Sequence, residues 1–313
     1  MMRCLGCYQD LKGGESDYHA SCARKLFGHP LPPDFPFTEA DLAPLAKQVI
    51  VSQTALTGVQ PKLSLHLDAR KPSGTARRFA LAGLQGGYIF KPPIARYPEL
   101  PEVEDLTMHL ARSARLKTAP HGLIRMQSGN LAYLTRRMDR TPQGKLAMED
   151  FCQLTERLTE DKYKGSYEQI GRTLLTHSAT PLLDAVNLFE VVVFCFITGN
   201  ADMHLKNFSL LEQAGLGMVL SPAYDLVNTA LVNPADNEEL ALTLNGKKRR
   251  LKRQDFVSAM TAVGLHAAQQ TKVMGKWHRA LPDWHELIDR SFLSPDFKAR
   301  YKDLIRDRMQ RLK

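Results

Sequence analysis

Apolar and polar residues alternate along several short stretches of the first 140 residues. Lys62–Asp68 alternates strictly, with Leu63, Leu65 and Leu67 on one face, and this pattern is typical of a half-buried strand. A helix is expected over Glu102–Leu116. Further strands are predicted over Arg78–Ala82, Tyr88–Lys91, Leu123–Met126 and Leu131–Arg137. The pattern therefore predicts a small sheet that carries one helix after its third strand.

Helical spacing dominates after residue 141. Helices are predicted over 149–158, 167–177 and 182–198, and the third is apolar nearly all round, which indicates a buried central helix. Short strands are expected over 208–211 and 218–220, and a hairpin over 240–251 with Asn245-Gly246 at its tip. An amphipathic helical region follows Asp255, with breaks near Pro282 and Pro295. The fold class is predicted to be α+β.

The pattern divides the chain into three expected segments. Residues 1–37 carry clustered cysteines and a proline-rich linker, residues 38–140 form a small β-rich lobe, and residues 141–313 form a mostly helical lobe. The second segment opens with a helix from Thr38 to about Gln53, because Thr38 and Asp41 have the spacing of a capping box with aspartate in place of glutamate.

Composition changes this picture little. Hydrophobic residues make up 43% and charged residues 24% of the chain, which excludes wholesale disorder. The longest apolar run, Val191 to Ile197, is too short to span a membrane, and no apolar signal segment follows Met1, so an intracellular protein is expected. The net charge is 42 − 33 = +9. A basic run over 247–253 suggests a solvated face, or alternatively a docking patch for a tRNA-bearing substrate protein.

Three of the five cysteines lie near the N-terminus. Cys4-x2-Cys7 is followed, after eleven residues, by His19-x2-Cys22. Two such pairs could hold one tetrahedral Zn²⁺, and the metal would be structural because four protein ligands leave no open position. The alternative is a reduced hairpin without metal. The odd cysteine count and the absence of a signal segment argue against a disulfide framework.

The strongest candidate for chemistry follows the buried helix. Asp202 and Asn207 lie in the polar stretch Gly199–Phe208 with the D-x4-N spacing of phosphotransferase catalytic loops. In such loops the aspartate orients the attacking hydroxyl and accepts its proton, while the asparagine holds Mg²⁺. Asp225 follows the strand at 218–220 and is placed to bind the same metal. Oxygen ligands of this kind suit Mg²⁺ rather than Zn²⁺.

A lysine on the predicted sheet is a further candidate residue of the phosphotransfer site. Lys91 ends the strand Tyr88–Lys91, and a lysine is a compact cation suited to the phosphates of ATP. The helix that follows offers Glu102 and Glu104 as ion-pair partners, and we expect Glu104 to be the partner. The order of lysine, acidic helix, D-x4-N and strand-end aspartate is unlikely to arise by chance.

These residues resemble the HipA-like serine/threonine kinases, toxins of bacterial toxin–antitoxin modules. The resemblance covers nearly the whole chain and implies a two-lobed, protein-kinase-like fold. It rests on the segments 57–65, 90–93, 135–140, 149–153, 199–210 and 220–225. It implies that Asp202 is the catalytic base and that Asn207 and Asp225 hold Mg²⁺. It assigns ATP binding to Lys91, Gly58, Gln60, Lys62, Glu104, Arg136, Met138 and His204, with backbone near Arg136 and Met138 at the adenine.

Two departures from the family pattern matter. Full-length members of the family carry an additional N-terminal subdomain of about a hundred residues. We expect it to be missing here, where the kinase core is expected to begin near Lys47, and in this the chain resembles the compact HipT-type kinases of three-gene modules. The family also autophosphorylates a serine just before the Gly58-Val59-Gln60 segment, and HipT-type kinases have two serines there. Here the corresponding positions are Ala55 and Thr57, so Thr57 is the expected site, with Ser52 and Thr54 as alternatives. A phosphate there would compete with ATP for Lys91 and Lys62.

The expected function is an ATP- and Mg²⁺-dependent serine/threonine protein kinase that acts as a growth-arresting toxin in the cytoplasm. By resemblance, its substrate is an aminoacyl-tRNA synthetase, and its partners are a HipB-like DNA-binding antitoxin and a HipS-like small protein. No membrane association and no direct DNA binding are expected. The first alternative is an aminoglycoside-like small-molecule phosphotransferase, which shares the D-x4-N spacing. The second is a non-enzymatic zinc-ribbon nucleic-acid binder, which would require Asp202, Asn207 or Asp225 to be lost.

Overall fold

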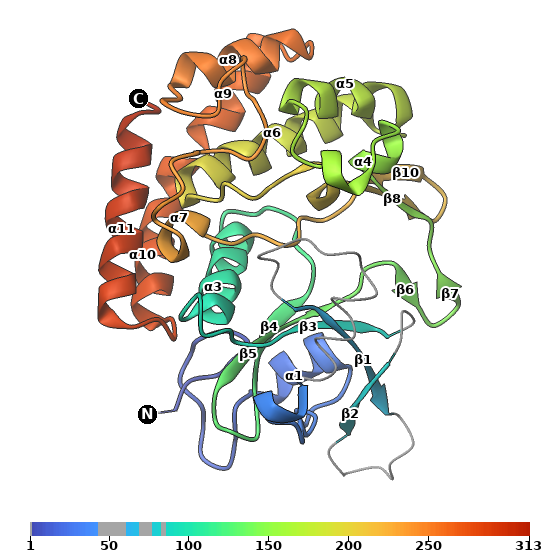
Figure 1. Ribbon diagram of the computed structural model, residues 1–313, viewed down its shortest axis with the longest axis vertical. Coiled ribbons are helices and arrows are strands. Elements are labelled where there is room, and N and C mark those ends of the chain that lie inside the picture. Colours follow the sequence, from blue (N-terminus) through green and yellow to red (C-terminus); the bar gives the residue numbers. More distant parts are fainter. Residues whose placement is uncertain (1, 43–60, 69–76, 83–85) are drawn as a thin grey trace. The chain divides into compact units, whose positions relative to one another are not determined.

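The computed structural model describes residues 2–42, 61–68, 77–82 and 86–313 (Figure 1). The chain divides into two compact units. The N-terminal unit comprises Met1–Asp105, Ala119–Met138 and Arg290–Phe292, and the helical unit comprises Leu106–Thr118, Asp139–Asp289 and Leu293–Lys313. The predicted combination of a β-rich part and a helical part is confirmed.

The N-terminal unit contains an antiparallel sheet in the order β2-β1-β3-β5-β4. Its strands are β1 (Leu63–Asp68), β2 (Arg78–Leu81), β3 (Tyr88–Lys91), β4 (His121–Arg125) and β5 (Leu131–Arg136). Leu63 and Leu65 are buried while His66 is exposed, so the predicted alternation is confirmed. Helix α3 (Leu100–Ser113) follows β3, as expected from the sequence.

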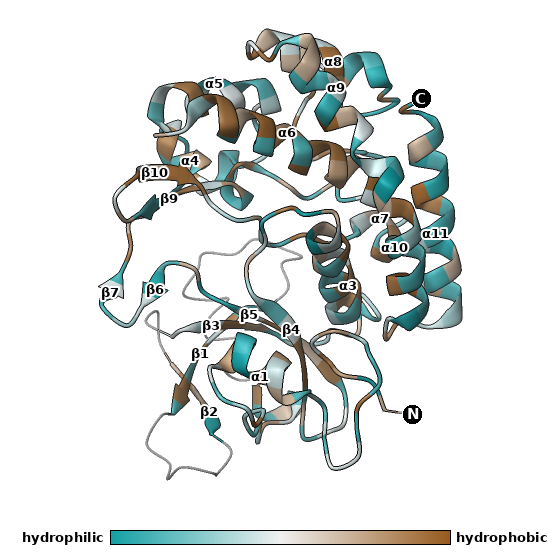
Figure 2. Ribbon diagram, turned by 180° about the vertical axis from the view of Figure 1, so that it is seen from behind, coloured by the Kyte–Doolittle hydropathy of each residue, from teal (hydrophilic) through white to brown (hydrophobic). Residues whose placement is uncertain are grey.

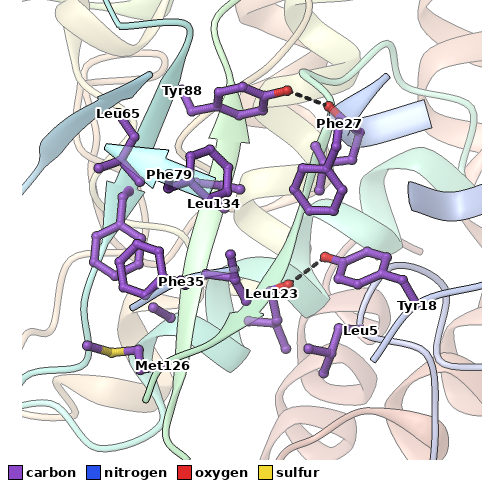
Figure 3. Close-up of a cluster of buried hydrophobic side chains, with 14 of the residues drawn as sticks. Leu5, Tyr18, Phe27, Phe35, Leu65, Phe79, Tyr88, Leu123, Met126 and Leu134 are labelled. Carbon is purple, nitrogen blue, oxygen red and sulfur yellow. Dashed lines mark hydrogen bonds between the residues drawn. The ribbon is translucent and has the colours of Figure 1, made fainter. Parts of the chain in front are cut away.

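The cysteine-bearing segment supplies much of the core of this unit (Figure 3). Helix α1 (Ala20–Phe27) begins after His19 and ends at Gly28 in the left-handed conformation. Phe35, in the proline-rich stretch, stacks on Phe90 of β3 with ring centroids 4.5 Å apart. The hydroxyl of Tyr88 donates to Leu26 O, and that of Tyr18 donates to Leu123 O. Residues 2–37 therefore close one face of the sheet.

Thr38 begins a helical stretch over residues 39–42. The backbone N–H and the hydroxyl of Thr38 both donate to Asp41 Oδ2 at 2.7 Å, and the backbone N–H of Asp41 donates back to Thr38 Oγ1 at 3.4 Å. The predicted capping box is thus confirmed. The rest of the expected helix lies outside the described residues.

The helical unit is built around helix α6 (Pro181–Thr198). Its 18 residues reach a mean hydropathy of 1.8, enough in length and composition to cross a membrane, but 67% of them are buried inside the protein. Figure 2 shows this helix largely in brown. The apolar character of α6 is thus accounted for by burial, as in the core helix of a folded domain.

Further helices and strands complete this unit. The α-helices are α4 (Phe151–Leu154), α5 (Tyr167–His177), α7 (Thr229–Val232), α8 (Arg253–Ala262), α9 (Ala267–Gly275), α10 (Trp277–Arg290) and α11 (Pro295–Gln310). The 3₁₀ turns are η1 (Thr159–Asp161) and η2 (Leu205–Asn207). Strands β8 (Met148–Asp150), β9 (Ser209–Gln213) and β10 (Gly217–Leu220) pair in the order β10-β9-β8, and β6 (Arg140–Thr141) pairs with β7 (Gly144–Lys145).

The expected helix over 149–158 is wrong at both ends. Residues 148–150 form β8, in which Glu149 pairs with Leu210 of β9. Asp150 then accepts a hydrogen bond from the backbone N–H of Gln153 in a capping box, and the four-residue helix α4 follows. The pairing with β9 and the cap together override the helical spacing. The local pattern of apolar residues gives no information about a strand partner sixty residues away.

Two further expectations also differ from the structure. Residues 240–251 contain the predicted turn, with Asn245 at φ 49° and Gly246 at φ 73°. Leu244 and Lys247 form an antiparallel bridge across it, so the tip of the predicted hairpin is confirmed, but the residues on either side do not form paired strands. Pro282 lies inside α10 instead of breaking it. The buried face of α10, which includes Trp277 and Trp284, offsets the roughly 3 kcal/mol that an internal proline costs. Pro295 does mark a helix start, at the first turn of α11.

Candidate active site

A tight turn after α6 presents the residues of the candidate catalytic loop in the helical unit. Gly199 adopts a left-handed conformation (φ 71°), and an added Cβ would lie 2.5 Å from Leu304 Cδ2 and 2.8 Å from Asn228 Oδ1. The turn thus requires glycine. Asn200 is fully buried, and its Oδ1 accepts a hydrogen bond from the backbone N–H of Asp202 at 3.0 Å. The backbone that carries Asp202 is fixed by these contacts.

Asp202 accepts a hydrogen bond from Tyr163. The distance from the Tyr163 hydroxyl to Asp202 Oδ1 is 2.6 Å. Burial, followed by the charge of Asp202 and this hydrogen bond, raises the pKa of Tyr163, and the charge of Asp225 adds to the effect. Tyr163 therefore stays protonated and donates to the carboxylate. Sequence reasoning missed Tyr163, because it lies 39 residues before its partner.

Asn207 lies beside Asp202, as the D-x4-N spacing predicts. Its Nδ2 donates to the backbone carbonyl of Asp202 at 2.9 Å, and its side chain is buried. Because the amide nitrogen is engaged in this way, the amide oxygen Oδ1 is the atom that can bind a metal. The 3₁₀ turn η2 ends at Asn207 and fixes its position.

Asp225 is held in a strained backbone conformation five residues after β10. Its φ of 60° lies in the left-handed region, which non-glycine residues seldom adopt and which often marks functional sites. The preceding residue is anchored: the hydroxyl of Tyr224 donates to Lys206 O at 3.0 Å and lies 2.6 Å from Ser209 Oγ. These contacts tie the segment that carries Asp225 to the candidate catalytic loop.

The oxygens of these residues suit a magnesium ion. Asp202, Asn207 and Asp225 offer two carboxylates and an amide oxygen, the hard ligands that Mg²⁺ prefers. A small pocket lies beside them in the same unit. It is lined by Val191, Met203, Asn207, Phe208, Leu220, Ser221, Pro222 and Ala223. The donor set of the helical unit therefore fits the metal that a phosphotransferase uses.

The N-terminal unit holds the predicted lysine in an ion pair. Lys91 Nζ lies 2.5 Å from Glu104 Oε1, and the two side chains are 5% and 2% exposed. Lys91 Nζ also lies 5.3 Å from the centroid of the Tyr133 ring. The choice of Glu104 over Glu102 as partner is thus confirmed. Burial raises the pKa of Glu102 to about 7.

The structure describes only some of the other residues that are predicted to bind ATP. Lys62 is exposed just before β1. Arg136 ends β5, and its backbone N–H donates to Pro120 O at 2.8 Å, so this N–H is already engaged; Met138 follows two residues later. The ring of His204 packs edge-on against Tyr163 at 5.0 Å. The predicted loop residues lie outside the described residues: Ser52, Thr54, Ala55, Thr57, Gly58 and Gln60.

The structure also describes the predicted zinc ligands. The ligand atoms of Cys4, Cys7, His19 and Cys22 lie within 4.8 Å of one another. Hydrogen bonding among the sulfurs lowers the pKa of Cys4 and raises that of Cys7.

In the basic run, Lys247 pairs with Asp255 at 2.7 Å and Lys248 with Glu238 at 3.2 Å. Arg253 donates to Leu312 O at 3.0 Å. Arg249, Arg250 and Lys252 are exposed, and the choice between a solvated face and a docking patch stays a prediction.

Comparison with known proteins identifies the family. The family described as HipA-like C-terminal domain matches residues 54–284. The chain belongs to this family. Among its relatives, "Putative kinase Y4dM" from Sinorhizobium fredii is 35% identical over 187 residues, covering 56% of this chain and 45% of that protein. A "Putative kinase" from Haemophilus influenzae is 28% identical over 212 residues, covering 63% and 59%. The chain thus spans about half the length of these relatives.

Two solved structures share the HipA-like fold. HipA of Shewanella oneidensis MR-1, solved with HipB and operator DNA, superposes with a TM-score of 0.70 at 22% identity, covering 88% of this chain and 71% of that one. The proinflammatory kinase CtkA of Helicobacter pylori gives a TM-score of 0.56 at 15% identity, covering 79% and 93%. The kinase-like fold predicted from the sequence is confirmed.

Proposed function

We propose that this HipA-like chain is an ATP- and Mg²⁺-dependent serine/threonine protein kinase. The observation that carries the proposal is the turn that brings Asn207 next to Asp202. The side-chain amide of Asn207 donates to the backbone carbonyl of Asp202 at 2.9 Å, and Asp225 is present in the same unit. Asp202 would accept the proton of the attacking hydroxyl, and Tyr163 would hold its carboxylate in the ionised form. Mg²⁺ held by Asn207 and Asp225 would neutralise charge on the phosphates.

The ion pair of the N-terminal unit has a matching role in this proposal. Glu104 would hold the ammonium group of Lys91 in place to bind the α- and β-phosphates of ATP. Lys62, Gly58 and Gln60 would bind phosphate groups, while backbone near Arg136 and Met138, together with His204, would bind the nucleotide.

The proposed biological role is that of a toxin in a bacterial toxin–antitoxin module. Its support is the family membership and the structural likeness to a HipA protein solved with HipB and operator DNA. The proposed target is an aminoacyl-tRNA synthetase, so that translation falls in the cytoplasm. HipB-like and HipS-like proteins would neutralise the chain. Autophosphorylation at Thr57 would inhibit it; we expect Thr57→Asp to be inactive and Thr57→Ala active in ATP turnover.

The decisive experiment is incubation of the purified chain with ATP, Mg²⁺ and bacterial lysate, followed by phosphosite mapping. Asp202→Asn should lose about 10²–10⁴-fold in rate, the usual contribution of a general base, and keep its thermal unfolding temperature. Tyr163→Phe should lose less of its rate. The acid limb of its pH–rate profile should move to higher pH, because the carboxylate of Asp202 loses a hydrogen-bond donor that favours ionisation. Asp283→Asn, an exposed aspartate of α10, is the matched control.

Full activity of Asp202→Asn would defeat the assignment. Phosphate found on a sugar or an antibiotic instead of a protein would identify a small-molecule phosphotransferase that uses the same loop.

A further inference from the structure

Four side chains of the N-terminal segment converge on one point with the geometry of a zinc site. Cys7 Sγ lies 3.3 Å from His19 Nδ1, and Cys22 Sγ lies 4.0 Å from the same nitrogen. Cys4 completes the group, with all ligand atoms within 4.8 Å of one another. Ligands at Zn–S and Zn–N bond lengths in a tetrahedron are about 3.5–3.8 Å apart. The cluster is therefore already close to the size that the metal requires.

The surroundings of the cluster orient it for a metal. His19 Nε2 lies 2.9 Å from the backbone carbonyl of Asp10. A carbonyl only accepts, so Nε2 carries the hydrogen and Nδ1, which faces the sulfurs, carries the lone pair. Metal-binding histidines are typically fixed by this kind of contact. The backbone N–H groups of Gly6 and His19 both donate to Cys4 Sγ at 3.4 Å, an arrangement that favours a thiolate.

The residue next to the cluster connects it to the ion pair of this unit. Tyr8 adopts a left-handed backbone conformation, with φ 64°, and its backbone N–H donates to Cys4 O at 2.9 Å. Its side chain is 1% exposed, and its hydroxyl donates to Asp105 Oδ2 at 2.7 Å. Asp105 directly follows Glu104, the partner of Lys91. The turn between Cys4 and Cys7 thus determines where Tyr8 meets helix α3.

Strand β4 makes a second connection. The backbone N–H of Leu123 donates to Leu5 O at 3.3 Å, and Tyr18 donates to Leu123 O. An added Cβ at Gly122 would lie 2.5 Å from the Tyr18 hydroxyl, so the cysteine-bearing segment approaches the strand as closely as a backbone allows. Asp105 Oδ1 also lies 2.8 Å from His121 Nδ1 at the start of β4.

We propose that Cys4, Cys7, Cys22 and His19 Nδ1 bind one structural Zn²⁺, and that this metal holds Tyr8 on Asp105. Three thiolates and one imidazole are a frequent structural zinc set. They close the coordination shell, so the metal has no part in phosphotransfer. The metal fixes the turn that bears Tyr8, and through Asp105 it limits the motion of the first turns of α3. The proposal does not depend on kinase activity.

The first test is the metal content of the full chain, purified without chelator and measured by mass spectrometry. We expect about one zinc per chain, and X-ray absorption should show three sulfur ligands and one nitrogen. Cys7→Ser and Cys22→Ser should each lose the zinc. Cys152→Ala, a buried cysteine of α4 outside the cluster, should retain it. Absence of metal from the wild type, or iron in place of zinc, would overturn the proposal.

The second test does not require cysteine variants to fold. A strong chelator is added to the wild-type chain, and hydrogen exchange is followed by mass spectrometry before and after zinc is returned. Amides in 100–105 and 121–125 should exchange at least tenfold faster without zinc and recover with it, while those of α6 should not change. Tyr8→Phe should keep its zinc but show faster exchange in 100–105. Unchanged exchange in the chelated chain would refute the coupling.

Discussion

The two units hold their candidate functional side chains by different kinds of contact. In the helical unit, Asp202 and Asn207 are five residues apart and are joined within a single turn. In the N-terminal unit, Lys91 depends on Glu104, and Asp105 next to it depends on Tyr8, which is 97 residues away in the sequence. Short-range spacing therefore determines one arrangement, and the packing of a whole unit determines the other.

The largest expected effect comes from breaking the long-range arrangement at its ion pair. Glu104→Ala would leave the ammonium group of Lys91 buried without its carboxylate, and loss of one partner of a buried pair costs about 3–5 kcal/mol. Urea unfolding should show this loss in the free energy of unfolding. A loss below about 1 kcal/mol would mean that the pair is solvated, as at a surface.

A double variant separates stability from function in the same unit. Lys91→Met with Glu104→Leu replaces the pair by apolar side chains of similar size and should recover most of the lost stability. If Lys91 binds the phosphates of ATP as proposed, the double variant should not recover phosphotransfer, because the phosphates would lack this cation. Recovery of both stability and phosphotransfer would show that catalysis does not require the ion pair.

The next largest effect tests the short-range arrangement. Gly199→Ala should cost about 1–2 kcal/mol from the backbone alone, and more because its Cβ meets Asn228, whose Oδ1 caps α7. Gly215→Ala is the matched control: Gly215 has φ +75°, and no atom lies within 4 Å of its added Cβ. Thermal unfolding should rank Gly199→Ala as the more damaging, and only this variant should slow phosphotransfer. Equal losses would show that the turn tolerates a side chain.

The smallest effect concerns Glu102, on the helix that also bears Glu104. Its pKa is raised to about 7 by burial, so between its unfolded value near 4.5 and pH 7 the folded chain binds more protons than the unfolded chain. Stability should therefore fall as the pH rises through this window. Glu102→Gln should flatten the dependence of urea unfolding on pH, whereas the exposed Glu160→Gln should not. A wild-type profile flat from pH 5 to 8 would contradict it.

The fold was predictable where a pattern is local. Strict alternation identified β1, turn residues separated the other four strands of the N-terminal sheet, and helical spacing identified α5 and α6. The errors arose where a distant partner decides the conformation. Residues 148–150 become a strand because β9 lies beside them, and α10 continues through Pro282 because its apolar face is buried. Neither the pairing with β9 nor the burial of α10 can be predicted from the neighbouring residues in the sequence.

The candidate site follows the same rule. The spacing between Asp202 and Asn207 predicted their contact, and the four residues of the cysteine cluster were recognisable from their two short pairs. Tyr163 could not be found, because nothing near residue 163 points to a partner at residue 202. The left-handed backbone of Asp225 was equally hidden, since aspartate seldom adopts it and no local motif requires it.

The packing of residues 2–37 against β4 also affects how this chain is made. The cysteine cluster leaves the ribosome before β4, and Leu123, which its neighbours Leu5 and Tyr18 contact, is synthesised more than a hundred residues later. At 5–20 residues per second, roughly 5–20 s of translation separate the two. During that interval the nascent segment must keep its thiols reduced and its apolar side chains shielded, so its exposure to oxidants and chaperones is set by the rate of translation.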